Sequence, residues 1–340
     1  MSDLYSNIFF LKQPVIISGP CSAETEEQVL ETAQRLKNTS KIHIFRSGIW
    51  KPRTRPGMFE GVGNIGLKWL KRVKEEIGLP VTVEVATDEH VRDALNSKID
   101  FLWIGARSTS NPFSIQEIAG ALKGIKIPVL IKNPTSPDVD LWSGAVERIR
   151  QAGIEQIALI HRGFSTYGNS LYRNPPMWPV AIEMKRRFPE IPMLCDPSHI
   201  CGNRHFLSSV CQQSIDLDYN GLMIESHFDP DHAWSDASQQ ITPEVLSEML
   251  DKLQWRSSNQ QLLDGMDVLK QLRKQIDLTD ENIIALLGKR MQFAEEIGRV
   301  KKDHAITILQ TERYNHILDK ALELSKTLGL SEDFIRSYFE

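Results

Sequence analysis

The chain has 340 residues, of which 41% are hydrophobic and 25% are charged, and its formal net charge is −4. This composition is that of an ordinary folded protein, long enough for one large domain and one small one. The weak net charge argues against a nucleic acid partner, and the sequence has no apolar run of the length that crosses a membrane. Residues 1–10 lack the pattern of a signal peptide, so we expect a cytosolic protein.

Short apolar segments alternate with helical segments through the first two thirds of the chain. Residues 7–12 resemble a short strand that would plug or edge a sheet, and eight β-type segments follow it. These segments are residues 15–18, 42–45, 81–85, 101–104, 129–132, 156–160, 193–195 and 221–225. Residues 24–38, 64–77 and 139–152, which lie between them, have helical patterns. Apolar strands that alternate with helices are typical of a parallel sheet covered on both faces.

The positions of the polar residues favour a closed barrel over an open, doubly wound sheet. In a barrel the functional side chains gather at the C-terminal ends of the strands, whereas an open sheet concentrates them at one switch point. Here every predicted strand has such a residue at or just after its C-terminal end. They are Cys21, Arg46, Glu84, Arg107, Lys132, Arg162, Asp196 and Glu225. We therefore predict an α/β fold, a (β/α)8 TIM barrel, over residues 1–255.

The remaining chain predicts a second domain of another class. Residues 256–265 are polar and form the expected linker, and apolar residues at three-to-four spacing then predict a small all-helical domain over residues 266–340. The expected helices are residues 266–302, residues 309–327 followed by Gly329, and a third that begins at Ser331. The third pattern is still amphipathic at Glu340, so we expect the rest of that helix to be missing from the chain.

A basic segment follows the second predicted strand. Its permanent cations are Arg46, Lys51, Arg53 and Arg55. Pro52 fixes φ and removes a backbone donor, so the loop that presents Arg53 and Thr54 is expected to be stiff. A stiff, basic, hydroxyl-bearing loop suits a phosphate group. The alternative is a solvated basic loop without a ligand.

Four further residues have the chemistry of metal ligands. Cys21 follows the first strand, His199 follows the seventh, and Glu225 ends the eighth, with Asp236 further along the same loop. One thiolate, one imidazole and two carboxylates suit one borderline divalent ion such as Mn, Fe, Co or Zn. The four cysteines of the chain form no CxxC pair, which argues against a disulfide framework and against a structural zinc site. Each ligand alone also fits a structural role; their joint placement indicates a metal.

The strand ends carry a set of short motifs within residues 15–240. They are Gly-Pro-Cys-Ser at 19–22, Phe-Arg-Ser-Gly-Ile-Trp-Lys-Pro-Arg-Thr at 45–54, Ile-Gly-Ala-Arg at 104–107, His-Arg-Gly at 161–163 and Asp-Pro-Ser-His at 196–199, with Lys132, Glu225 and Asp236. This set resembles 3-deoxy-D-arabino-heptulosonate 7-phosphate (DAHP) synthase. The resemblance implies the condensation of phosphoenolpyruvate with erythrose 4-phosphate, which is the first step of the shikimate pathway.

The resemblance also implies roles for individual residues. The metal ligands would be Cys21, His199, Glu225 and Asp236; phosphoenolpyruvate would bind to Arg46, Lys51, Arg107, Lys132 and Arg162; erythrose 4-phosphate would bind to Pro52, Arg53 and Thr54. Several fixed cations suit a substrate that carries both a phosphate and a carboxylate. The metal would act as a Lewis acid on the aldehyde. We expect Lys51 to donate a proton to the aldehyde oxygen and His161 to align the attacking water.

A sister family, 3-deoxy-D-manno-octulosonate 8-phosphate synthase, is the alternative. It shares the barrel and the phosphoenolpyruvate cations. Its members carry an Asn-rich motif after the lysine that corresponds to Lys51, and many metal-free members have Asn in place of the cysteine. Pro52-Arg53-Thr54 and Cys21 of this chain therefore favour the four-carbon sugar.

The C-terminal domain resembles the all-helical chorismate mutase. The residues that carry this resemblance are Arg273, Arg290, Lys301 and Arg313. Rearrangement of chorismate to prephenate needs no nucleophile, so cations that hold two carboxylates and the breaking ether oxygen suffice. Arg273 and Arg290 would lie about 25 Å apart along one helix, so one helix does not bring both to a small ligand. The resemblance therefore implies a homodimer in which the partner supplies the early arginine.

Two other interpretations of the helical domain remain open. The cations could simply solvate a long helix, or the domain could bind prephenate or chorismate as a regulatory sensor for the barrel. Gln310 stands where family members often have an acidic residue, and the incomplete third helix lacks residues that would close the pocket. Both points favour low mutase activity in the 340-residue chain.

Overall fold

The protein is described here from a computed structural model. The described residues are 8, 14–51, 57–168, 170–256, 267–308 and 310–339. They divide into two compact units, Met1–Ser258 and Asn259–Glu340, and each unit is described by itself. Of the short strand predicted at residues 7–12, only Ile8 is described. Most of the predicted linker, residues 256–265, also lies outside the described residues. In the described part of the chain, no helix combines the length and apolar character needed to cross a membrane.

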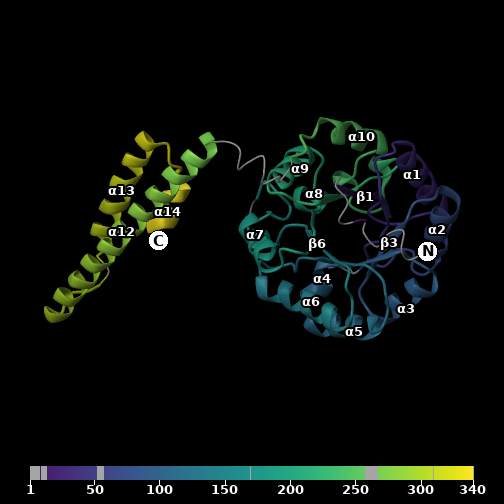
Figure 1. Ribbon diagram of the computed structural model, residues 1–340, viewed down its shortest axis with the longest axis horizontal. Helices are drawn as coiled ribbons and strands as arrows, with labels where there is room; N and C mark the ends of the chain where they lie inside the picture. The colour runs from purple at the N-terminus through teal and green to yellow at the C-terminus, as the bar shows by residue number, and fades with distance from the viewer. Residues whose placement is uncertain are drawn as a thin grey trace. The chain divides into compact units, whose positions relative to one another are not determined.

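Within the described residues of the first unit, eight parallel strands close into a barrel (Figure 1). The strands are β1 (Val15–Gly19), β2 (Ile44–Arg46), β3 (Val81–Val85), β4 (Phe101–Ile104), β5 (Val129–Lys132), β6 (Ile157–His161), β7 (Met193–Cys195) and β8 (Gly221–Glu225). β8 pairs with β1 from Val15 opposite Gly221 to Gly19 opposite Glu225. This pairing confirms the predicted barrel, and the open sheet is wrong.

Helices surround the strands (Figure 1). They are α1 (Glu26–Asn38), α2 (Ile65–Arg72) continued by a π-helix (Val73–Ile77), α3 (Asp88–Asn96), α4 (Ala106–Thr109), α5 (Pro112–Leu122), α6 (Val139–Gln151), α7 (Trp178–Arg187), α8 (Pro197–Cys201), α9 (Leu207–Asp216) and α10 (Pro243–Lys252). Side chains placed just before the helices cap several of them. Thr25, Thr87 and Asp138 each accept a hydrogen bond from a backbone N–H in the first turn of α1, α3 and α6. These caps fix the residues at which the three helices begin.

Alternate residues of each strand face opposite sides of the barrel wall. One set forms an apolar cluster in the lumen together with Ile8, which precedes β1: Val15, Ile17, Ile44, Phe101, Trp103, Leu130, Ala158, Ile160, Leu194 and Met223. The other set, which includes Val83, Leu159 and Ile224, packs in a second cluster with the helices. Continuing the lumen alternation to the strand ends gives Arg46, Glu84, Lys132, Asp196 and Glu225. The polar residues of five strands thus share the inner face.

The second unit consists of α12 (Asp267–Asp303), α13 (Thr311–Leu328) and α14 (Glu332–Phe339). α13 ends at Gly329, whose φ of 68° is in the left-handed region that favours glycine. Ser331 caps α14, because its Oγ accepts from the backbone N–H of Phe334 at 3.2 Å. Among the described residues of this unit, only Ser325 and Ile335 are buried. The three helices therefore leave most of their apolar side chains in contact with solvent.

His161 lies on the outer side of the barrel wall, contrary to the expectation that it aligns water in the site. In β6 it lies on the same side of the strand as Ile157 and Leu159, so its ring is directed to the helix layer. Its Nε2–H donates to Pro176 O at 2.6 Å, and its Nδ1 accepts from the hydroxyl of Tyr219 at 3.0 Å. Both ring nitrogens are thus used in a fully buried position, and the residue is structural.

The buried His161 predicts a pH-dependent stability. Burial lowers its pKa from 6.5 to about 4. Below pH 6.5 the imidazole of His161 therefore takes up a proton in the unfolded chain but not in the folded chain. The contribution of His161 to the free energy of unfolding is thus fully present above pH 6.5 and is lost as the pH falls toward 4. We expect the free energy of unfolding to drop by about 3 kcal/mol for this residue over that range.

The measurement is denaturant unfolding followed by tryptophan fluorescence, since all seven tryptophans lie before residue 258. His161→Gln removes the titrating group and should show a shallower dependence of stability on pH than the wild type. His232→Gln, at a histidine whose side chain is 83% exposed, is the matched control and should keep the wild-type slope. Equal slopes for all three proteins would contradict the assignment.

Candidate functional site

Two buried ion pairs stand at the C-terminal ends of the strands. Arg46 NH1 lies 3.2 Å from Glu225 Oε1, and Lys132 Nζ lies 2.7 Å from Asp196 Oδ2. Burial opposes ionisation of Asp196, but His199 and Lys132 hold its pKa well below the ordinary value. Burial opposes ionisation of Glu225 as well, and His199 and Arg46 lower its pKa. Buried charges of this kind are tolerated because each has a partner of opposite sign.

The ring of Trp103 is close to the cations of both pairs. The Arg46 guanidinium carbon is 4.8 Å from the centre of the Trp103 ring, and Lys132 Nζ is 6.0 Å from it. The indole N–H donates to Glu84 Oε2 at 3.2 Å. Gly105 leaves room for this carboxylate, because a Cβ there would be 1.9 Å from Glu84 Oε1. One buried aromatic ring thus contacts two cations and one anion.

A pocket opens above these groups, and cationic side chains dominate its lining. It is lined by Lys51, Glu84, Gly105, Ala106, Arg107, Lys132, Arg162, Arg173, His199 and Asp236. Burial, together with the nearby Arg173 and Arg107, lowers the pKa of Arg162 to about 10, although Asp196 opposes this shift. A surplus of positive charge in one pocket suits a ligand with several negative charges. Arg107, Lys132, Arg162 and Lys51 were predicted from the sequence to meet here.

The four predicted metal ligands form two close pairs. Cys21 Sγ lies 3.2 Å from Asp236 Oδ2, and His199 Nε2 lies 3.7 Å from Glu225 Oε1. Lys51 Nζ lies 2.6 Å from Cys21 Sγ. In the ranges that the structure describes, no group of three or more His, Cys, Asp or Glu side chains is already arranged to hold a metal ion.

The chemistry of these residues nevertheless fits a borderline divalent ion. Burial raises the pKa of the Cys21 thiol to about 12, so a nearby cation is needed to stabilise its thiolate. Lys51 and Arg173 hold the pKa of Asp236 below its ordinary range, although burial opposes this. Glu225 Oε1 is buried without a hydrogen-bond partner. One sulphur, one nitrogen and carboxylate oxygens are the mixed set of donors that such ions bind.

The predicted site for the second phosphate lies outside the described residues. Pro52, Arg53 and Thr54 belong to this part of the chain. The two ends of the loop are nevertheless described. The backbone N–H of Lys51 donates to Glu60 O at 2.8 Å. The ring of Trp50 stacks on the ring of His90, with the two ring centres 4.1 Å apart.

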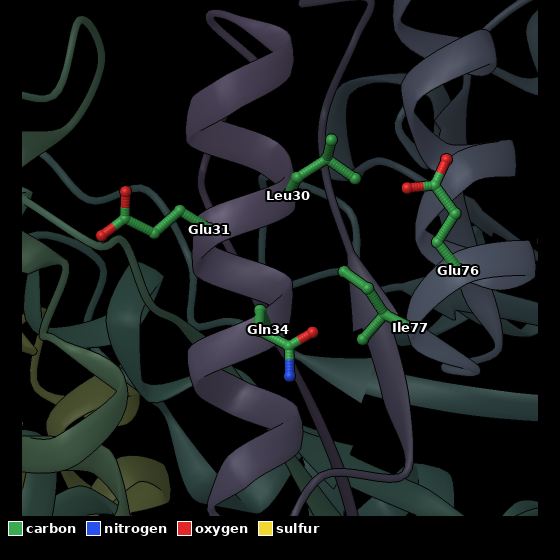
Figure 2. A pocket seen from close by; sticks show the side chains of 5 residues that line it. All are labelled: Leu30, Glu31, Gln34, Glu76 and Ile77. Carbon is green, nitrogen blue, oxygen red and sulfur yellow. The ribbon is translucent and has the colours of Figure 1, made fainter.

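A second hollow lies on the outer surface between α1 and the π-helix (Figure 2). It is lined by Leu30, Glu31, Gln34, Glu76 and Ile77, which Figure 2 shows on the two helices that face each other. Its charged side chains are carboxylates, whereas the strand-end pocket has cations. An anionic ligand therefore fits the strand-end pocket and not this groove.

Comparisons with known proteins follow the two units. Residues 12–262 match the DAHP synthetase I family, and residues 272–340 match chorismate mutase type II. The chain belongs to the DAHP synthetase I family. Its C-terminal residues form a chorismate mutase type II domain. The family resemblance predicted from the motifs is confirmed for both domains.

Individual relatives of this DAHP synthetase I member carry two different names. The chain is 29% identical over 238 residues to phospho-2-dehydro-3-deoxyheptonate aldolase of Thermotoga maritima, covering 70% of this chain and 68% of that protein. It is 30% identical over 258 residues to 2-dehydro-3-deoxyphosphooctonate aldolase of Magnetococcus marinus, covering 70% and 85%. A crystal structure of the Thermotoga maritima DAHP synthase matches with a TM-score of 0.64 and 28% identity, covering 74% of this chain and 70% of that one.

The predicted ligands of the mutase domain lie on its helix surfaces. Arg273, Arg290 and Arg313 are exposed, and Lys301 is partly buried. The Arg290 guanidinium is 5.8 Å from the ring of Phe339 in α14, and Lys301 Nζ donates to Ile308 O at 2.7 Å. Within the described residues of this one chain, Arg290 and Lys301 share α12 with Arg273, which supports the prediction that one helix does not assemble the site.

Several residues of the synthase site were not assigned from the sequence. Asp196 was placed at a strand end but given no role. Trp103 could have been found, because it belongs to the lumen residues in the alternation of its strand. Arg173 and Gln239 lie in loops, where no periodic pattern exists. Their contacts with Asp236 and Glu225 appear only in three dimensions.

The position of Trp103 predicts a role in binding phosphoenolpyruvate. Trp103→Leu removes the ring that Arg46 and Lys132 contact, and we expect the affinity for phosphoenolpyruvate to fall about tenfold. Trp103→Phe keeps an aromatic face and loses only the N–H to Glu84, so its affinity should change less than threefold. Titration calorimetry with phosphoenolpyruvate measures both. Wild-type affinity in Trp103→Leu would show that the ring does not support the cations.

Proposed function

We propose that the barrel condenses phosphoenolpyruvate with erythrose 4-phosphate to give DAHP and phosphate, in a metal-dependent reaction. The observation that carries this proposal is the cationic pocket at the strand ends, above two buried ion pairs. Phosphoenolpyruvate carries a phosphate and a carboxylate, and Arg107, Lys132 and Arg162 offer it charge-assisted hydrogen bonds. We also propose the domain limits 1–255, 256–265 and 266–340. The cytosolic location stays a prediction.

The side chains of the chain itself provide binding, orientation and a proton. Arg46 and Lys132 hold phosphoenolpyruvate so that its enol carbon faces the aldehyde carbon of the sugar, where the new C–C bond forms. Lys51, a compact cation beside Cys21 in the pocket, donates a proton to the aldehyde oxygen. A bound divalent metal would supply Lewis acid polarisation of that aldehyde. Water then adds to the neighbouring carbon and phosphate leaves.

The octulosonate synthase reaction is the alternative for the barrel, and relatives of both names match the chain. Two features of the sequence favour the four-carbon sugar. They are Cys21, which is among the described residues, and Pro52-Arg53-Thr54, which lies outside them. Offering the two sugars separately tests the choice.

The first experiment follows phosphoenolpyruvate consumption by the metal-stripped protein before and after Mn²⁺ is added. We expect consumption only with Mn²⁺ and erythrose 4-phosphate, and none with arabinose 5-phosphate. Cys21→Ala should abolish the consumption that Mn²⁺ restores, because it removes a ligand. Cys211→Ala, at another fully buried thiol, is the matched control and should retain it. Consumption with arabinose 5-phosphate would instead assign the chain to the octulosonate reaction.

We propose that the helical domain converts chorismate to prephenate within a homodimer, and that it senses prephenate for feedback. The support for the dimer is the exposed apolar face of α12. Its exposed side chains include Leu272, Ile276, Ile283, Met291, Ile297 and Val300. A contiguous apolar surface of this kind is typical of an interface. A second copy that covers this face would also bring its Arg273 near Arg290, and one small ligand could then contact both cations.

The dimer is tested by sedimentation equilibrium. The wild type should have the mass of two chains at micromolar concentration. Ile283→Glu places a charge on the apolar face, and we expect it to shift the protein to the mass of one chain, because an unpaired charge would be desolvated in the interface. Gln275→Glu, an exposed position of the same helix, is the control and should remain dimeric. A monomeric wild type would contradict the proposal.

A further inference from the structure

Three of the predicted metal ligands, His199, Glu225 and Asp236, have two atoms that could bind a metal. In each of them, another side chain holds one of these two atoms. His199 is the simplest case. Its Nδ1–H donates to Asp196 Oδ1 at 2.9 Å, and its Nε2 therefore carries the lone pair and lies 3.7 Å from Glu225 Oε1. Asp196 Oδ2 also lies 2.7 Å from Lys132 Nζ, which fixes the position of this carboxylate. The imidazole is thus fixed in the tautomer that binds a metal through Nε2.

Gln239 holds one oxygen of Glu225. The Gln239 side chain is fully buried, and its Nε2 donates to Glu225 Oε2 at 2.6 Å. The other oxygen, Oε1, is buried without a hydrogen-bond partner and faces His199. A buried carboxylate oxygen without a hydrogen bond is costly, even beside the Arg46 guanidinium, so its position indicates a ligand that the protein side chains do not provide.

The same glutamine is linked to the second carboxylate. Gln239 Oε1 accepts from Arg173 NH1 at 3.0 Å, and this nitrogen also donates to Asp236 Oδ1 at 2.9 Å. Asp236 Oδ2 is turned the other way and lies 3.2 Å from Cys21 Sγ. One continuous chain of contacts, from Asp236 through Arg173 and Gln239 to Glu225, therefore holds one oxygen of each carboxylate.

The loop that carries Asp236 and Gln239 is hydrogen-bonded to the loop after β1. Asp236 has a φ of 49°, an uncommon value for a residue with a side chain, at the start of the turn Ala237–Gln239. Gln240 Oε1 accepts from the backbone N–H of Cys21 at 2.9 Å, and Ser22 Oγ lies 2.5 Å from Ser235 Oγ. The strained turn is therefore held in register with the loop that presents the thiol.

We propose that Gln239, together with Arg173, is a positioning residue that makes both carboxylates bind the divalent metal through a single oxygen. Glu225 would present Oε1 and Asp236 would present Oδ2. This inference rests on the proposed metal-dependent function and names the residues that shape the site. A carboxylate that binds through both oxygens occupies two coordination positions, so holding one oxygen of each keeps positions for a substrate oxygen.

The test uses the metal-stripped full-length protein and two readouts other than turnover. Gln239→Met keeps the length of the side chain and removes both hydrogen bonds. We expect its Mn²⁺ affinity, measured by titration calorimetry, to fall about 10- to 100-fold. With Co²⁺, the visible absorption of the variant should be weaker than that of the wild type, because a carboxylate that binds through two oxygens raises the coordination number. A merely structural glutamine would not change this spectrum.

Gln28→Met is the matched control. Gln28 is also a buried glutamine with two hydrogen bonds, from Glu24 N and to Ser22 O, and it contacts none of the four ligands. It should keep the wild-type affinity and spectrum. If Gln239→Met fails to fold, Arg173→Lys serves in its place, since it keeps the charge but shortens the reach to Asp236 and Gln239; the same weakening and spectral change are expected.

The outcomes separate the two proposals. If the wild type binds Mn²⁺ and the Gln239→Met or Arg173→Lys variant has the same Mn²⁺ affinity and the same Co²⁺ spectrum, the positioning role alone is overturned. Absence of Mn²⁺ binding by the wild type would overturn the metal-dependent function and the positioning role with it. A loss as large in Gln28→Met as in Gln239→Met would show that any buried glutamine has this effect, and it would also overturn the inference.

Discussion

Closure of the barrel through β1 and β8 is the constraint on which the site depends. Their register puts Gly19 opposite Glu225, so the loops that carry Cys21 and Asp236 leave neighbouring strands. Two residues 215 positions apart in the chain thereby come within 3.2 Å. Gly19 permits the close packing, because a Cβ there would be 2.0 Å from Arg46 O. Since the closed sheet has no edge, all strand ends face one site.

The site combines buried pairs with an excess of positive charge. Arg46 and Lys132 are paired with carboxylates and supported by Trp103, so their positions are set before a ligand arrives. Arg107 and Arg162 add positive charge at the pocket, and burial makes the charge of Arg162 costly. An anionic substrate offsets that cost when it binds. Charge that is preorganised in this way favours binding without further rearrangement.

The predictions from the sequence were good where a pattern repeats, and they misplaced one residue at a strand end. The eight strands were predicted because each is a short apolar run, and the barrel because every run ends in a polar residue. His161 shows the limit of that argument. It follows the predicted strand 156–160, but β6 continues through it, and the alternation of side chains directs it outward to Tyr219. A polar residue at a strand end belongs to the site only when the alternation of side chains along the strand directs it to the lumen.

The sequence by itself determined the fold class, the family and the set of cations, because these depend on local periodicity and on short contiguous motifs. Only the tertiary structure decided which atoms meet. The contacts of Gln239 with Glu225 and Arg173 join loops that have no repeating pattern, so their partners follow from the closure of the barrel and not from spacing. The same holds for α12. Its apolar stripe is visible in the sequence, but its exposure is visible only in the folded helices, because helix packing within one chain leaves that face uncovered.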